Sequence, residues 1–194
     1  MNPAVRTVIA IDGPAASGKS STAQWVAERL SFRHVDSGSL YRGLTAAMLR
    51  TAQPPIDWTG RAVVAEGRRI GLRAEATSFL LLIDGESADE ELRGAGVTER
   101  VSQVARMPEV RAWVNERVRE AAAQHDVVVD GRDMGTAVFP DAPLKIFLIA
   151  DPWERARRRL VQRLGRRPAD DEIAAETDQI VQRDAKDATQ TVQA

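Results

Sequence analysis

The chain has 194 residues, which is enough for one domain, or for a core domain with a small insertion. Its 27 basic and 28 acidic side chains nearly cancel, so its charge does not suggest a nucleic-acid polymer or a membrane surface as a partner. The absence of cysteine excludes disulfides, thiolate zinc sites and cysteine catalysis. Residues 1–11 contain one arginine and no long apolar run, so we expect no signal peptide and a cytoplasmic protein, which we take to be a monomer.

Short apolar segments alternate with amphipathic ones at the start of the chain. Residues 7–11 are apolar and mostly β-branched and precede a glycine-bearing loop, which predicts a buried parallel strand. Residues 18–30 carry apolar side chains at the i, i+3, i+4, i+7 spacing of a helix. We expect a brief strand over 33–35 and a helix over 39–51, which ends before the two prolines at 54 and 55.

The middle of the chain has a different pattern. Residues 70–74 and 78–83 predict two antiparallel strands, and Asp84–Gly85 is typical of the turn that follows them. Helices are expected over 97–105 and 108–123, the second with Pro108 in its first turn. The region 61–106 is therefore predicted to be a small β-plus-helix insert.

Buried strands and helices return towards the end. Residues 126–130 (DVVVD) and 144–149 (LKIFLI) predict strands, and residues 152–164 and 170–186 predict helices. Strands that alternate with helices indicate an α/β fold with a doubly wound parallel sheet. We expect one domain over residues 1–194, in which 1–60 and 107–194 form the core.

One motif predicts phosphate binding. Residues 13–20 (GPAASGKS) match the pattern G-x-x-x-x-G-K-[ST] between a predicted strand and a predicted helix. Glycines let backbone N–H groups and the helix N-terminus approach an anion closely. Lys19 would act on the β- and γ-phosphates of ATP as a catalytic residue, and the Ser20 hydroxyl would bind Mg²⁺. The residues expected to bind ATP are Gly13, Pro14, Ala15, Ala16, Ser17, Gly18, Lys19, Ser20 and Ser21.

The motif leaves the phosphoryl acceptor open among water, a small alcohol and a second nucleotide. The N-K-x-D motif of switch GTPases is absent, and a molecular motor would need a longer chain. A kinase for small acceptors needs further cations, because anionic oxygens crowd both sides of the transferred group.

Two clusters at predicted strand ends supply such groups. Residues 36–42 (DSGSLYR) offer backbone donors at a helix start and Arg42 for a phosphate, although a helix cap with a surface arginine would look the same. Residues 130–136 (DGRDMGT) place three charges against two glycines. Asp130 is expected to hold Mg²⁺ or its waters, and Arg132 to bind an acceptor phosphate as a catalytic residue.

A third cluster is the basic run over residues 154–159, followed by arginines at 163, 166 and 167. Such a run can be a solvated helix face. It is also suitable for a lid over about residues 155–168, which would bring cations to the γ-phosphate. The two histidines, His34 and His125, lack partners at metal-site or triad spacing, and we interpret them as structural.

Taken together, these residues resemble those of the bacterial cytidylate kinases. The similar segments cover most of the chain and are GPAASGKSS (13–21), DSGSLYR (36–42), SQVARMPEVR (102–111), DGRDMGTAVFPDA (130–142) and RDAKD (183–187). The resemblance implies a nucleoside monophosphate kinase core, a CMP-binding insert and a short lid. It implies phosphorylation of CMP, and of dCMP, by ATP with Mg²⁺.

The resemblance also implies residue roles. The cytosine base and the CMP phosphate would be bound by Ser37, Arg42, Arg111, Arg132 and Asp133. The ribose would lie near Ser102, Arg183 and Asp187, and the catalytic lid arginines would be Arg155, Arg158 and Arg159. Two other hypotheses remain open, namely a P-loop kinase for a different small acceptor and a nucleotide-binding module without turnover.

Two departures from the family pattern are visible. Position 190 is a glutamine where many members have an arginine, which puts one phosphate contact in question. Family members continue beyond this point with an apolar strand and a helix. We therefore expect either a truncated form or a sheet that closes without its last strand.

Overall fold

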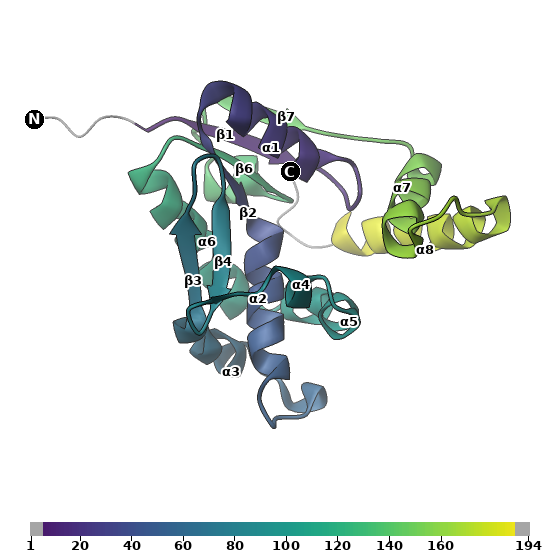
Figure 1. Ribbon diagram of the computed structural model, residues 1–194, viewed down its shortest axis with the longest axis horizontal. Coiled ribbons are helices and arrows are strands. Elements are labelled where there is room, and N and C mark those ends of the chain that lie inside the picture. Colours follow the sequence, from purple (N-terminus) through teal and green to yellow (C-terminus); the bar gives the residue numbers. More distant parts are fainter. Residues whose placement is uncertain (1–5, 189–194) are drawn as a thin grey trace, which may run out of the picture.

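The computed structural model describes residues 6–188, apart from the side chains of residues 183 and 186–188. In this part of the chain, four parallel strands form a sheet in the order β2-β6-β1-β7 (Figure 1). These strands are β1 (Val8–Asp12), β2 (Arg33–Asp36), β6 (Val127–Gly131) and β7 (Leu144–Phe147). All four predicted strands are present, but β7 is shorter than expected and largely exposed instead of buried.

The strand register brings acidic residues to one edge of the sheet. Asp12 at the end of β1 lies opposite Gly131, and Asp36 at the end of β2 lies opposite Asp130. The carboxyl ends of parallel strands are where ligands bind in open α/β sheets. The residues that follow these strands are therefore directed to the same region.

Helices cover both faces of the sheet, which confirms the predicted α/β fold class. The longer helices of the core are α1 (Lys19–Leu30), α2 (Ser37–Leu49) and α6 (Pro108–Gln124). Ala23 and Ala27 of α1 pack with Ile9, Ile11 and Val128 on one face. Because side chains alternate along a strand, Val127 and Val129 point to the opposite face, where they join the cluster that contains α2 and α6.

The start of α2 differs from the prediction. The helix begins at Ser37 rather than near Ser39, although serine and glycine are weak helix formers. Two side-chain hydrogen bonds hold this first turn. Ser37 Oγ donates to the Asp130 carbonyl over 2.7 Å, and Ser39 Oγ donates to the Asp36 carbonyl over 2.6 Å.

A second sheet lies beside α2. In the described chain it has the antiparallel order β3-β4-β5, with β3 (Ile70–Ala74), β4 (Phe79–Ile83) and β5 (Glu86–Ser87). The other elements of this region are η1 (Pro55–Asp57), α3 (Gly60–Ala65), η2 (Glu66–Arg69), α4 (Asp89–Leu92) and α5 (Ala95–Val104). The two predicted strands and the helix over 97–105 are confirmed. The shorter elements were not predicted.

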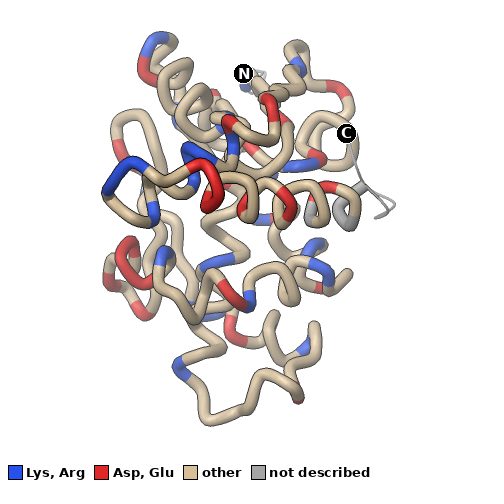
Figure 2. Tube along the Cα trace, turned by 90° about the vertical axis from the view of Figure 1, so that its right-hand side faces the viewer, with Lys and Arg blue, Asp and Glu red and all other residues tan. Residues whose placement is uncertain are grey.

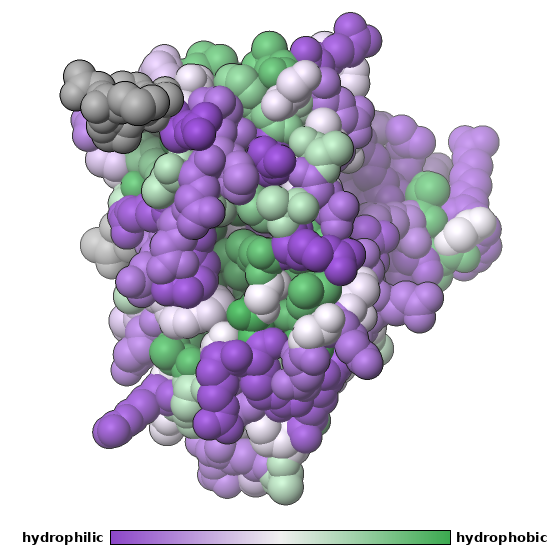
Figure 3. All heavy atoms as spheres, turned by 60° about the vertical axis from the view of Figure 1, so that its left-hand side comes forward, coloured by the Kyte–Doolittle hydropathy of each residue, from purple (hydrophilic) through white to green (hydrophobic). Residues whose placement is uncertain are grey.

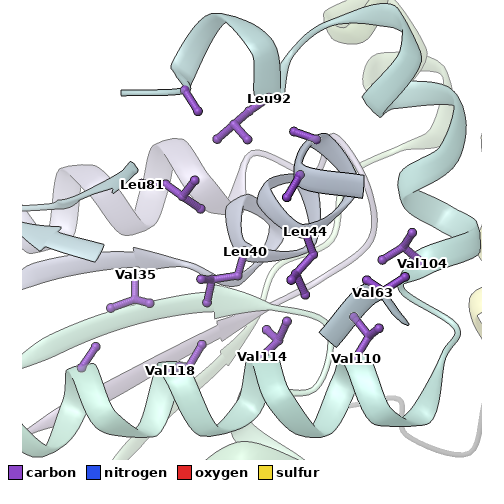
Figure 4. Close-up of a cluster of buried hydrophobic side chains, with 14 of the residues drawn as sticks. Val35, Leu40, Leu44, Val63, Leu81, Leu92, Val104, Val110, Val114 and Val118 are labelled. Carbon is purple, nitrogen blue, oxygen red and sulfur yellow. The ribbon is translucent and has the colours of Figure 1, made fainter. Parts of the chain in front are cut away.

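The region 61–106 shares its hydrophobic core with the parallel sheet. Figure 4 shows Leu40 and Leu44 of α2 between a row of α6 valines and side chains of the insert, Leu81 and Leu92. All of these side chains are buried. The insert is therefore packed as a continuation of the core through α2.

The last two helices, α7 (Pro152–Leu164) and α8 (Asp170–Ala188), lie to one side of the sheet (Figure 1). They bury a small cluster of their own, made by Ala156, Leu160, Ile173 and Ile180. Figure 2, in which this pair faces the viewer, shows basic and acidic positions next to one another along it. The pair forms a separate packing unit beside the P-loop.

On the face shown in Figure 3, hydrophilic residues surround a central apolar area. Within residues 6–188, no helix combines the length and the hydropathy needed to cross a membrane.

Candidate active site

The P-loop connects β1 to α1 at the carboxyl edge of the parallel sheet. Gly13 passes so close to the residue that follows β7 that an added Cβ would lie 2.2 Å from the Leu148 carbonyl oxygen. Gly18, directly before α1, has a φ of +96°, a conformation that other residues rarely adopt. Gly13 is therefore required because the two backbone segments approach closely, and Gly18 is required because of its backbone conformation.

Cationic side chains hold the backbone of this loop. Arg132 donates to the Gly13 carbonyl over 3.0 Å, and Lys19 Nζ donates to the Pro14 carbonyl over 3.3 Å. Arg155 of α7 donates to the Ala15 carbonyl over 3.2 Å. Three cations that were predicted to act on phosphates thus converge on one loop.

The Ser17 side chain in the same loop is a buried polar group without a partner within residues 6–188. Its hydroxyl is buried and has no hydrogen-bond partner among the described residues. A buried hydroxyl without a partner costs free energy unless a ligand satisfies it. This observation fits a loop that receives a phosphate oxygen.

The predicted metal-binding pair is brought together by the sheet. Ser20 Oγ on α1 donates to Asp130 Oδ2 at the end of β6 over 2.8 Å. Burial raises the pKa of Asp36, and the charge of the nearby Asp130 raises it further. Among the described residues no cluster of three or more His, Asp or Glu side chains could hold a metal by itself. A hydroxyl and a carboxylate are, however, a typical protein contribution to Mg²⁺ bound with phosphates.

His34 has a partner that its spacing in the sequence did not reveal. Its Nε2 lies 2.6 Å from Asp130 Oδ1. The two residues are 96 positions apart and meet because β2 and β6 are neighbouring parallel strands. No spacing rule within the sequence could have revealed this contact.

Asp12 is a second residue that the sequence analysis did not identify. Its two carboxylate oxygens accept hydrogen bonds of 2.8 Å from the amides of Met134 and Gly135. Burial raises the pKa of Asp12, while the two amides and the charges of Lys19 and Arg132 oppose that rise. An acidic residue at the end of a buried strand was the available signal. Asp12 fixes the turn that carries Arg132 and Asp133.

An acid–base pair joins the segment after β6 to α6. Arg111 Nη2 on α6 donates to Asp133 Oδ2 over 2.6 Å, and Asp133 is only 2% exposed. Burial raises the pKa of Asp133, and Arg111 opposes this effect. Burial raises the pKa of Tyr41 on α2 to about 12, with smaller effects from the charges of Arg111 and Asp133. Tyr41 therefore lies close enough to this pair for both charges to act on its hydroxyl.

Further arginines gather around Arg42 of α2. Burial lowers the pKa of Arg42, and the charges of Arg159 and Arg93 lower it further, whereas Asp36 raises it. Arg42 donates to the Leu92 carbonyl over 3.2 Å. Arg93 was not singled out from sequence, because it stands outside every recognised motif. The mutual repulsion of these cations would be relieved by a bound anion.

The predicted lid arginines occupy different environments. Arg155 is 3% exposed and pairs with Asp184 of α8 at 2.5 Å, in addition to its contact with the P-loop. Arg158 lies 3.6 Å from the position that a Cβ on Gly18 would take. Arg159 pairs at 3.1 Å with the buried Glu176. Arg158 thus faces the start of α1, while the other two also hold α7 against α8.

The remaining predicted residues are placed as follows. The Ser37 hydroxyl is buried at the start of α2, where it binds the Asp130 carbonyl. Ser102 lies on α5, and Ser21 on the first turn of α1. Arg183 and Asp187 lie on the last turns of α8, and their side chains are outside the described part of the structure. Gln190 lies outside the described residues.

Comparison with known proteins agrees with this arrangement. The family model "Cytidylate kinase" matches residues 9–194. The chain belongs to the cytidylate kinase family. The cytidylate kinase of Chloroherpeton thalassium is 39% identical over 194 residues, which cover 96% of this chain and 80% of the relative. Those of Thermus thermophilus and Mycolicibacterium paratuberculosis are 45% and 40% identical, and the matches cover 80% and 95% of this chain and 76% and 81% of the relatives.

Membership of the cytidylate kinase family confirms the resemblance and the enzyme class that were inferred from the motifs. The chain is a nucleotide-binding transferase. The P-loop, the turn after β6 and the start of α2 are the parts of this cytidylate kinase fold that meet at the carboxyl edge of the sheet.

Proposed function

We propose that this chain transfers the γ-phosphoryl group of ATP to CMP and dCMP, with Mg²⁺ bound at Ser20 and Asp130. The observation that carries the choice of base is the pair of the buried Asp133 and the half-buried Arg111 near Tyr41. The P-loop accounts for ATP, and the family supports the reaction class.

The acid–base pair suits cytosine. Cytosine presents an N4 amino donor beside an N3 acceptor, whereas uracil presents an O4 acceptor beside an N3–H donor. Asp133 can accept from N4, and Arg111 can donate to N3. With uracil, both contacts would bring together groups of the same kind, and such buried mismatches reject an analogue strongly.

The acceptor phosphate is assigned to the arginines around α2. These arginines come from three different segments and are Arg42, Arg93 and Arg132. The charges of Arg93 and Arg159 add to burial in lowering the pKa of Arg42. Guanidinium groups can form two parallel hydrogen bonds to a phosphate. Ser37, at the start of α2, would add a hydroxyl, and the ribose would be bound by Ser102, Arg183 and Asp187.

In the reaction, an oxygen of the CMP phosphate attacks the γ-phosphorus in line, and the bond from that phosphorus to the β–γ bridging oxygen breaks. Lys19, Arg132 and the lid arginines offset the charge on the transferred group and on the leaving ADP. Mg²⁺ bound to the phosphates would neutralise part of the same charge. Asp130 and the Ser20 hydroxyl supply the oxygen ligands that such an ion prefers.

An acceptor panel tests this proposal. ADP release is measured with CMP, dCMP, UMP and AMP at a fixed MgATP concentration. We expect kcat/KM for CMP to exceed the values for UMP and AMP by at least about tenfold, because the Arg111–Asp133 pair matches the donor and acceptor of cytosine alone. Preference for another monophosphate would instead show a kinase with a different acceptor. Saturable ATP binding without turnover would show a binding module.

Closure of the enzyme around both nucleotides is a second expected result. The region 61–106 and the α7–α8 pair should become more protected from hydrogen exchange when CMP and a non-hydrolysable ATP analogue are both present. Closure excludes water and so limits wasteful ATP hydrolysis. Strand β6 is fully buried and serves as the internal control, since its exchange should remain slow throughout. Unchanged exchange in both outer regions would contradict this motion.

A further inference from the structure

The carboxylate of Asp130 is contacted on both of its oxygens. Oδ2 accepts from the Ser20 hydroxyl over 2.8 Å, and Oδ1 lies 2.6 Å from Nε2 of His34. The His34 side chain is 10% exposed and that of Asp130 is 1% exposed. A short hydrogen bond in a buried setting fixes a carboxylate far more firmly than a contact with water would.

The imidazole ring is itself held in place. Its Nδ1 lies 3.2 Å from Gln24 Oε1, which can only accept, so the ring donates to Gln24 and Asp130 together only when both of its nitrogens carry a proton. The Gln24 amide is oriented by its own Nε2, which donates to Glu28 Oε1 over 2.7 Å, so that its oxygen faces the ring. The backbone of His34 is fixed within β2, and its amide donates to the Thr77 carbonyl of the insert over 2.9 Å. The donor that faces Asp130 therefore has little freedom.

Without such a donor, Asp130 would be placed poorly for a metal. Asp36 lies on the neighbouring strand at the same register, so a second carboxylate stands directly beside Asp130. Residues that hydrogen-bond a metal-ligating carboxylate set its orientation, and their loss commonly weakens metal binding by about 10–100-fold. His34 is the side chain in this structure that is placed to do this on the oxygen opposite Ser20.

We propose that His34 is a positioning residue for the metal site: its Nε2–H holds Asp130 in the orientation that binds Mg²⁺ together with Ser20. This inference rests on the proposed assignment of Mg²⁺ to Ser20 and Asp130. It gives a role in metal binding to a histidine that the sequence analysis interpreted as structural.

The test compares His34→Leu, which removes the donor, with His34→Gln, which keeps an N–H that can reach Asp130. Binding of Mn²⁺ to the protein–ADP complex is titrated by electron paramagnetic resonance, and the Mg²⁺ dependence of kcat is measured separately. We expect His34→Leu to raise the half-saturating Mn²⁺ and Mg²⁺ concentrations at least about tenfold. Turnover at saturating Mg²⁺ should remain within about threefold of wild type, and His34→Gln should restore most of the affinity.

Two controls separate the outcomes. His125→Leu removes the other histidine, which contacts Arg33 and Phe79 instead of Asp130, and should bind Mn²⁺ as wild type does. Asp130→Asn tests the metal site itself. Tight Mn²⁺ binding by His34→Leu together with weak binding by Asp130→Asn would overturn the role of His34. Tight binding by Asp130→Asn would overturn the metal assignment. If His34→Leu does not fold, His34→Asn, which is polar but too short to reach Asp130, replaces it with the same expected result.

Discussion

Replacement of Lys19 by alanine is expected to lower kcat by roughly 100–1000-fold while the protein remains folded, because one donor to the transition state is lost. Lys19 is the first residue of α1, and its ammonium group lies over the loop, where it donates to the Pro14 carbonyl. Burial raises the pKa of both Asp12 and Asp36, and the charge of Lys19 opposes that rise. The change is measured as kcat for ADP release at saturating CMP and MgATP.

Two further variants make this result specific. Lys19→Met keeps the volume of the side chain without its charge and should lose as much activity as Lys19→Ala. Lys145→Ala removes an exposed lysine that also donates to a backbone carbonyl, that of Pro140, and should stay within about threefold of wild type. Near-normal turnover by a folded Lys19→Met protein would contradict the role of this lysine in phosphoryl transfer.

Asp133→Ala is expected to lower kcat/KM for CMP by about 100-fold and to shrink the preference for CMP over UMP at least about tenfold. The loss should be larger for CMP, because only cytosine offers an amino donor to this carboxylate. The variant also leaves the half-buried Arg111 without its 2.6 Å partner, which adds to the cost for either base. The ratio of the two kcat/KM values is therefore the decisive measurement.

The isosteric variant Asp133→Asn separates base recognition from the support of Arg111. An amide can accept from the cytosine amino group or, turned over, donate to uracil O4. We expect this variant to use UMP relatively better than wild type does. Asp141→Ala, an exposed acid on the same segment, is the matched control and should leave the ratio unchanged. An unchanged ratio in both Asp133 variants would assign this residue to structure.

The parts of the fold that could be predicted are those with strong local signals. Helices α6 and α7 begin at Pro108 and Pro152 and were predicted with the correct first residue. Strand β6 is a run of three valines between polar residues, which is typical of a strand buried on both faces. The P-loop was predicted in full, because its spacing is set by the shape of a phosphate group.

The parts that could not be predicted depend on short elements or on distant partners. Strand β5 has two residues and α4 has four, too few for any periodicity to be detected. The π-helical turn η3 (Met134–Val138) follows the bonds that Asp12 makes from another strand. The contact of His34 with Asp130 and the effect of Arg93 on Arg42 likewise depend on neighbours that only the folded chain brings together.

The buried hydrophobic residues form separate clusters, and this affects how cooperatively the protein unfolds. Because the insert shares its cluster with the parallel sheet, it cannot unfold without exposing side chains of the main core. Among the described side chains, the α7–α8 pair buries four apolar ones of its own, so its local opening should cost far less free energy than global unfolding. A substitution such as Ile180→Ala should then alter the opening equilibrium of this pair, whereas the main thermal transition would follow the larger cluster.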